Sequence, residues 1–442
     1  MDETPAKRRP TLKRLLLWGV PALVVAITAI HTWQWHRALL DWERAVHRIE
    51  DRGEPVQFAD LVVEIDSPDD DAGPLLLKAI HALQEPDAAY IQLIAAEPPT
   101  RAGTHAALRD ALRANQKSLD FVVQASERPH CRFSADAYLF DQRRMEILKC
   151  RELGDLLRAQ VLWSLGTGDE PAALAAVIQG FQLAELVGEE SLAASRFTAI
   201  AIQNKSLRAL EELLSNMDVG SEGFAELDTQ VRRAEQRCRC ETLLQANRVA
   251  LLDGTGFLTL RESIGLPGAP QWVVSGKRWL YEPWVTDNVV YWIQALTELA
   301  AIADSPGLEN AEIQDWSRRV GESKYSLAQP YLIAARQLRE PILTMRQQLI
   351  LARWGLRVDR YYRQHGRFPA ALSLVADDEL PAVAPDSLFE QPLSYETYPG
   401  GFVVRIADQE HADAEFLRDC RFEVSYSGTG DLQDAADVST QE

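Results

Sequence analysis

The sequence predicts a mainly α-helical protein with an N-terminal transmembrane helix and a small C-terminal α+β cap of antiparallel strands. Three observations lead to this prediction. An apolar run follows a basic N-terminus, most segments between residues 106 and 303 have apolar side chains at helical spacing, and β-favouring residues cluster only after Pro369. The helical part is expected to be a bundle of helical hairpins or an irregular solenoid.

The composition is that of a globular protein with a strong acidic balance. The chain has 442 residues, of which 46% are hydrophobic and 25% are charged, and its formal net charge is −19. Binding to a nucleic-acid duplex depends on neutralising phosphates with Lys and Arg. We therefore do not expect nucleic acid among the partners.

The N-terminus has the pattern of a signal anchor. Residues 1–14 form a basic segment, and residues 15–35 follow as an apolar run of about the 20 residues that a helix needs to cross a bilayer. Because the basic residues precede the span, the N-terminus is expected in the cytoplasm and the rest of the chain on the far side of the membrane. A cleaved signal peptide is the alternative, and the length of the apolar run favours a retained anchor.

Residues 36–340 are predicted to form an exported all-helical body. The segment 37–51 continues the anchor as a charged helix that ends near Gly53. Between residues 161 and 186 the pattern indicates a helix end, a Gly-rich turn and a second helix. In the next helix, apolar residues recur at steps of three and four, and Asn204 interrupts this stripe as an expected buried, hydrogen-bonded amide.

Within the body, residues 254–292 are predicted to be an aromatic-rich insertion. Because this segment is rich in Gly and Pro, we expect it to form a long loop. Its aromatic side chains either pack on the helical core or line a groove that binds a sugar or a peptide, and both alternatives stay open. The candidate partner-binding residues in this segment are Trp272, Trp279, Tyr281 and Trp284.

Residues 341–442 are predicted to form a long helix and a small tail. The helix starts after Pro341, ends at His365–Gly366, and has a core-facing stripe of Ile342, Met345, Leu349, Ala352 and Leu356. Four arginines within a narrow arc either pair with the protein's own acidic surface or bind an anionic partner: Arg346, Arg353, Arg357 and Arg360. Three β-favouring segments around the Pro399–Gly401 turn predict an antiparallel sheet.

Motifs that carry catalysis or bind metals are missing from the sequence. A serine-hydrolase elbow, an HExxH pair, a CxxC pair and a phosphate-binding loop are all absent, so no catalytic residue, metal or cofactor is predicted. This weighs against an enzyme without deciding the question. Among five scattered cysteines, Cys131 and Cys150 allow a disulfide, whereas Cys238 and Cys240 are expected to be one packed and one surface thiol.

The C-terminal tail resembles that of type II secretion pseudopilins. The stretches YYRQHGRFPAAL and LPAVAPDSLFEQPLSYETYPGGFVV carry this resemblance, and the matching positions are Tyr361, Gly366, Phe368, Pro369, Asp386, Pro392 and Tyr395. Ser387 and Glu390 depart from the proline and glycine of that family, and the N-terminus lacks the pilin cleavage motif. In that family the tail loop can bind calcium, which Asp431, Asp434 and Asp437 match only loosely.

The chain is also similar to bacterial single-pass, membrane-anchored proteins with a helical exported body. The stretches GEPVQFADLV and WLYEPWVTDNVVYWIQAL carry this similarity together with the tail. It implies a location in the bacterial inner (cytoplasmic) membrane with the bulk of the chain in the periplasm. It implies no activity.

These patterns together predict a membrane-anchored envelope scaffold or interaction protein. One alternative is an accessory component of a pseudopilin-like secretion or pilus assembly, and another is a membrane-anchored hydrolase or binder of envelope glycans. The expected partners are the membrane, through the N-terminal helix, and a second envelope protein.

Overall fold

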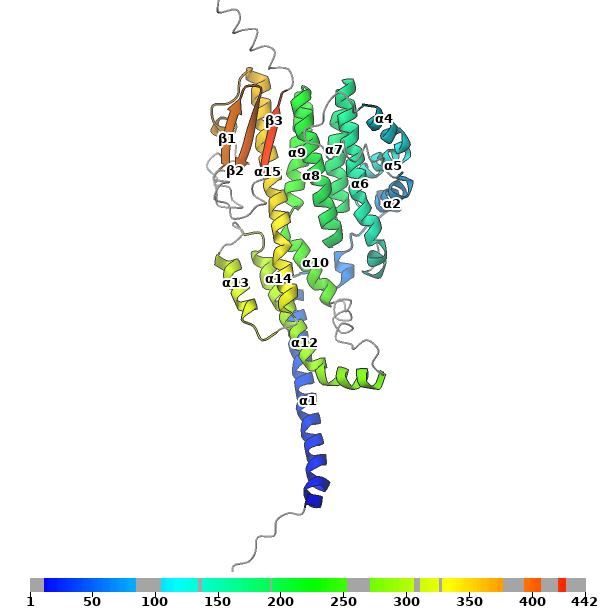
Figure 1. The fold of residues 1–442 in the computed structure, drawn as a ribbon, viewed down its shortest axis with the longest axis vertical. Coiled ribbons are helices and arrows are strands. Elements are labelled where there is room, and N and C mark those ends of the chain that lie inside the picture. The colour runs from blue at the N-terminus through cyan, green and yellow to red at the C-terminus, as the bar shows by residue number, and fades with distance from the viewer. Residues whose placement is uncertain are drawn as a thin grey trace, which may run out of the picture.

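The computed structural model describes residues 12–84, 105–133, 137–190, 193–252, 271–305, 311–325, 328–376, 393–406 and 420–426. For residues 12–19, 105, 137–143 and 271–282 the description covers the backbone alone. The described chain is mainly helical and has a three-stranded antiparallel sheet near its C-terminus (Figure 1). The predictions of a helical body and of a small C-terminal sheet are confirmed.

A single helix, α1 (Leu12–Glu50), joins the N-terminal apolar run to the body. Its first half projects from the body, while its second half packs against α12 (Gln271–Ile302) (Figure 1). Ala38, Ala45 and Ile49 are the buried contact residues of that second half. The chain leaves the helix at Gly53, whose φ of 68° is a conformation that glycine adopts at little cost.

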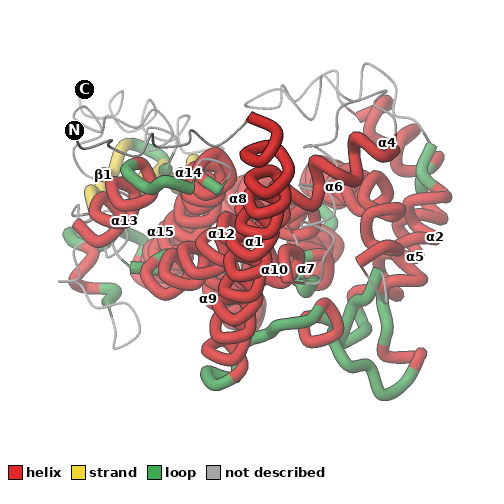
Figure 2. The backbone as a smooth tube through the Cα atoms, turned by 90° about the horizontal axis from the view of Figure 1, so that it is seen from below, coloured by secondary structure: helices red, strands yellow, loops and turns green. Residues whose placement is uncertain are grey.

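The centre of the body is an array of helical hairpins. Two 3-10 turns, Phe58–Leu61 and Pro68–Asp70, lead into it, and its helices are α2 (Gly73–Ala82), α4 (His105–Ala114), α5 (Gln116–Ser126), α6 (Ala137–Thr167), α7 (Glu170–Val187), α8 (Ala193–Asn216), α9 (Ser221–Arg237) and α10 (Cys240–Leu252). Each of α6, α7 and α8 contacts the other two. Seen along the long axis, the sheet lies at one edge of the body, with α2, α4 and α5 at the other (Figure 2).

The turn between α6 and α7 shows why the predicted hairpin forms. Gly168 has a φ of 74°, and the Asp169 side chain accepts a hydrogen bond from the backbone N–H of Ala172 at 3.2 Å. This bond satisfies one of the free N–H groups at the start of α7. The helix–turn–helix prediction for this segment is confirmed.

The aromatic-rich segment differs from the prediction, because it is helical from Gln271 onward rather than a long loop. The helix α12 contains Pro283, and the part before it runs crosswise to α1 (Figure 1). Beyond the proline, apolar side chains at helical spacing enter the core: Val285, Val289, Ile293, Leu296 and Leu299. Residues 253–270 lie outside the described part of the chain.

The last helices are α13 (Ala311–Gly321), α14 (Gln329–Gln337) and α15 (Arg339–His365). The predicted stripe from Ile342 to Leu356 is buried at every position, so the core-facing side of α15 is confirmed. The helix ends as predicted, since Gly366 has a φ of 66° and donates its N–H to the Tyr362 carbonyl at 2.8 Å.

The sheet consists of β1 (Leu393–Tyr398), β2 (Gly401–Ile406) and β3 (Arg421–Ser425) in the order β1-β2-β3. Its inner face is buried against α15 by Phe402, Val404, Ile406, Phe422 and Val424. The outer edge of β3 is covered by α8: the N–H groups of Glu423 and Ser425 donate to Glu211 Oε1 (3.0 Å) and Ser215 Oγ (3.1 Å). An edge that is paired in this way is protected against pairing with another chain.

A charged network fastens the end of the sheet to α15 and α8. The hydroxyl of Tyr426 donates to Asp359, which is fully buried on α15. Arg363 donates to Asp359 at 2.8 Å, to Asp218 at 3.0 Å and to the Leu214 carbonyl at 2.8 Å. Because these groups come from three separate segments, breaking the network loosens the sheet from the helices.

The carboxyl group that meets β3 should make the stability of the fold depend on pH. Burial raises the pKa of Glu211 to about 7. The folded protein then keeps this proton up to about pH 7, whereas the unfolded chain releases it near pH 4.5. Raising the pH across this window therefore favours the unfolded state, by about 3 kcal/mol at most.

Glu211→Gln tests this expectation, because glutamine keeps the acceptor oxygen for Glu423 N–H but does not titrate. Chemical denaturation at pH 4.5 and 7.5 should show the wild type losing stability relative to the variant as the pH rises. Glu222→Gln, at an exposed position of α9, is the control. An offset between wild type and Glu211→Gln that is the same at both pH values would contradict the expectation.

Candidate functional site

Residues 20–30 of α1 expose apolar side chains on every side of the helix. Every residue from 20 to 30 is exposed, and the larger side chains are 46–67% exposed: Val20, Leu23, Val24, Val25, Ile27 and Ile30. Among the helical segments whose side chains are described, none has both the length and the apolar character that a bilayer crossing requires.

The four aromatic candidates lie on α12. Trp284 is 41% exposed, just beyond Pro283. Trp272, Trp279 and Tyr281 belong to the crosswise first part of this helix, and their side chains lie outside the description. Two further aromatic residues of α12 stack on rings from other segments of the body: Tyr291 on Tyr325, and Trp292 on Tyr331 of α14. For these two the packing alternative is therefore confirmed.

The four arginine candidates on α15 do not share one environment. Arg353 is buried and pairs with Glu235 at 2.8 Å and with Asp228 at 3.6 Å, both on α9. This is the intramolecular alternative, so a docked partner cannot reach Arg353. Arg346 and Arg357 are partly buried and Arg360 is exposed. A partner-binding role for these three stays a prediction.

The residues that match the pseudopilin tail are partly described. Phe368 stacks on Tyr362 with ring centroids 4.4 Å apart and meets Phe402 of the sheet edge-on. Pro369 is buried, Tyr361 stacks on His365, and Tyr395 lies on β1. Asp386, Pro392, Asp431, Asp434 and Asp437 lie outside the described residues.

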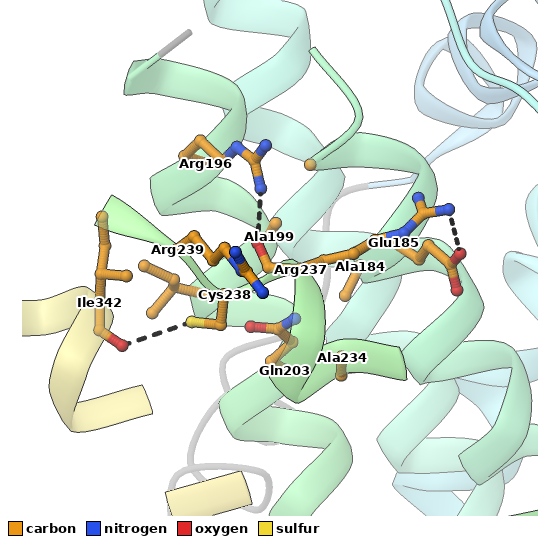
Figure 3. A pocket seen from close by; sticks show the side chains of 12 residues that line it. Ala184, Glu185, Arg196, Ala199, Gln203, Ala234, Arg237, Cys238, Arg239 and Ile342 are labelled. Atoms are coloured by element: carbon orange, nitrogen blue, oxygen red, sulfur yellow. Dashed lines mark hydrogen bonds and ion pairs between the residues drawn. The ribbon is translucent and has the colours of Figure 1, made fainter. Parts of the chain in front are cut away.

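A pocket that the sequence analysis did not predict lies between α7, α8, α9 and the start of α15 (Figure 3). The space between its walls is about 420 Å³ when the adjoining open solvent is included, and the pocket is only partly enclosed. One face of α8 lines it through residues at steps of three and four, and the other walls complete the set: Ala184, Glu185, Gly188, Arg196, Ala199, Ile200, Gln203, Ala234, Arg237, Cys238, Arg239 and Ile342.

The pocket is positively charged, because its lining contains three arginines and one glutamate. Arg237 pairs with Glu185 at 2.8 Å, and Arg196 donates to the backbone carbonyl of Arg237 at 3.0 Å. Burial lowers the pKa of Arg196. Arg239 is exposed and donates to the Gln236 carbonyl at 3.3 Å. Arg196 and Arg239 thus each donate to a backbone carbonyl, and an anion bound beside them adds a favourable charge interaction.

The polar floor of the pocket is Gln203, which is only 6% exposed. Within the described part of the chain its side-chain amide makes no hydrogen bond. Figure 3 shows this amide beside Cys238 and Ala234. The amide lines the pocket and keeps some contact with solvent there. A ligand that displaces this solvent can form hydrogen bonds both to the amide oxygen and to the amide nitrogen.

The prediction of a buried amide on α8 is correct in kind but wrong in position. Asn204, the expected core amide, is exposed, and its neighbour Gln203 is buried instead. The reason is that α8 contacts α6, α7 and α15. Its buried surface is therefore wider than one apolar stripe.

The prediction that one of Cys238 and Cys240 is a surface thiol is also wrong, since both are buried. The chain between them breaks from α9 to α10, and Asp304 caps the new helix by accepting from the N–H groups of Cys240 (3.0 Å) and Glu241 (3.2 Å). Cys238 Sγ lies 3.3 Å from the Ile342 carbonyl, and burial raises the pKa of this thiol to about 12. It is therefore a poor nucleophile at neutral pH.

The other cysteines are also free and buried, including Cys131 and Cys150, so the allowed disulfide is not formed. Across the described ranges, no group of three or more His, Cys, Asp or Glu side chains is placed to hold a metal ion.

The pocket could not be predicted from the sequence because its residues come from four separate elements. One signal was present: Arg196, Ala199, Ile200 and Gln203 recur at the spacing of one helical face, which mixes charged, small and amide side chains. A face of this kind is neither a core stripe nor an ordinary solvated one.

No protein-family model, curated protein or solved structure matches the chain.

Proposed function

We propose that this protein is an interaction protein of the bacterial cell envelope, held to the cytoplasmic membrane by α1 and carrying its helical body on the periplasmic side. The observation that carries the proposal is the exposure of apolar side chains all around the first half of α1. A helix that is apolar on every side is stable where lipid or a protein core surrounds it.

Polar groups in this half of α1 support the proposal. The hydroxyls of Thr28 and Thr32 donate to the carbonyls of Val24 (2.9 Å) and Thr28 (2.8 Å), so both are satisfied within the helix. Trp33 is exposed and lies under the guanidinium of Arg37 at 5.9 Å. An aromatic residue next to a cation suits the boundary between lipid and water.

The direction of insertion follows from the sequence on either side of the apolar run. Five Lys and Arg residues precede it, and they favour a cytoplasmic N-terminus. The acidic body then lies outside the cytoplasm. Intact spheroplasts treated with protease should lose the body, whereas a cytoplasmic marker protein should survive.

Introducing two arginines into the exposed apolar segment of α1 should release the protein from the membrane. In the double variant Val24→Arg and Ile27→Arg, each charge costs about 2.5–3.5 kcal/mol near the centre of a spanning helix. We expect the wild-type protein to stay in the membrane pellet after carbonate extraction and the double variant to be extracted. Ile333→Arg, at an apolar position of α14 that is 52% exposed, is the control for added charge. Equal extraction of all three proteins would refute the anchor.

The second candidate function is an accessory role in a pseudopilin-like assembly. The observation that favours it is the tail, in which α15 ends at Gly366 and a small antiparallel sheet packs back on the helix through Phe368 and Phe422. The glycan alternative has the partly exposed Trp284 as its described support.

A further inference from the structure

We propose that the pocket between α7, α8, α9 and α15 binds the C-terminal residue of a peptide. The arginines receive its carboxylate, and Gln203 receives the N–H of the same residue. In naming a partner class this inference rests on the proposed interaction role. The binding experiment is nevertheless independent of membrane attachment.

The charge of the pocket selects an anion. Arg196 and Arg239 both lie above Gln203 in the view of Figure 3. Arg237 is already held by Glu185 at 2.8 Å. Guanidinium groups present paired donors that match the two oxygens of a carboxylate. An anion placed between Arg196 and Arg239 therefore gains two charged contacts in a partly desolvated site.

The amide of Gln203 narrows the choice among anions. An amide has both a donor and an acceptor, and both lack a partner within the described residues. A simple carboxylate such as acetate supplies acceptors only, and so leaves the Gln203 oxygen without a donor. The last residue of a peptide supplies a carboxylate and a backbone N–H about one residue apart. It therefore satisfies the arginines and the amide together.

The walls set the size of the terminal side chain. Ala184, Ala199 and Ala234 are small, and Ile200 and Ile342 add apolar surface. The space of about 420 Å³ between the walls includes open solvent, and the enclosed part is much smaller, so we expect it to favour a small apolar side chain over an aromatic one. We expect alanine or valine at the end of the peptide to bind better than tryptophan or a charged residue.

The test is fluorescence anisotropy with the full-length protein in detergent. The probe is fluorescein-labelled Gly-Gly-Ala with a free carboxylate, and the comparison is the same peptide with a C-terminal amide. We expect the free carboxylate to bind at least about 10-fold more tightly, and unlabelled N-acetyl-alanine to compete far better than acetate. Equal binding of the two peptides, or equal competition by acetate, would overturn the proposal.

Three variants separate recognition from stability. Arg239→Gln, at an exposed position, should weaken the binding of Gly-Gly-Ala about 10-fold, whereas Arg233→Gln, which removes the same charge from an exposed position of α9 outside the pocket, should not. Gln203→Leu should weaken binding by a similar factor without lowering the melting temperature, because no hydrogen bond within the described chain is lost. Equal losses in both arginine variants would reduce the effect to long-range attraction and refute the site.

Loss of peptide binding and loss of anchoring are distinguishable. The double α1 variant that leaves the membrane should bind Gly-Gly-Ala as the wild type does, since the pocket is formed by other helices.

Discussion

Replacing Gly355 with alanine should destabilise the protein by about 3 kcal/mol or more, even though alanine is normally the better residue inside a helix. Gly355 lies within α15, where alanine would ordinarily add about 1 kcal/mol of stability. Here a Cβ atom would overlap with the ring of Phe422 on β3. Phe422 is 2% exposed, so its ring has no free space to move into. Overpacking of this kind in a filled core costs 1–3 kcal/mol and occasionally more.

The measurement is chemical denaturation of the wild type and Gly355→Ala, together with limited proteolysis of the C-terminal region. We expect the sheet to become sensitive to protease before the helical body does, because the clash acts where the sheet packs on α15. Gly321→Ala is the matched control, since a Cβ at the end of α13 meets no atom within 4 Å. A Gly355→Ala variant as stable as that control would show that the sheet does not pack on α15 as described.

Replacing Arg248 with methionine should cost about 2–3 kcal/mol. Arg248, on α10, is fully buried and pairs with Glu54. It also donates to Thr297 Oγ1 at 3.2 Å and to the Pro55 carbonyl at 3.3 Å. The single guanidinium thus joins the segment after α1 to α10 and α12. Removing one partner of a buried pair leaves the other charge uncompensated, and the partial exposure of Glu54 reduces that cost.

The expected loss is measured by urea denaturation at neutral pH. The control is Arg319→Met, which breaks an ion pair to Glu298 of 2.9 Å between two side chains that are each 53% exposed. Exposed pairs contribute little because water and salt screen them. If Arg248→Met and Arg319→Met changed the free energy of unfolding equally, the buried ion pair would contribute no more to stability than the exposed one.

The parts of the fold that local chemistry determines were predictable from the sequence. The end of α15 depends on one glycine in a left-handed conformation, Gly366, and the β1–β2 hairpin depends on Gly400, whose φ is 83°. The buried stripe of α15 follows from spacing, whereas the burial of every residue from 351 to 356 depends on the elements that surround the helix.

The parts that depend on several elements at once were not predictable. α12 has large apolar or aromatic side chains on many sides, so its helical period is hidden by composition, and Gly and Pro nearby suggested a loop. The break between Cys238 and Cys240 depends on Asp304, a cap that lies some sixty residues further along the chain. The choice of Gln203 over Asn204 as the buried amide depends on how three helices surround α8.

The continuity of α1 also has a mechanical meaning. A 39-residue helix is about 58 Å long, and here residues 20–30 are exposed while the second half packs on the body through a few buried side chains. The two halves form one continuous helix without a flexible joint between them. A surface that binds the first half therefore also sets the tilt of the body and the distance between the pocket and that surface. A glycine-rich insertion near Trp35 would replace this rigid helical connection with a flexible linker. The body would then sample many orientations while its own folding stayed intact.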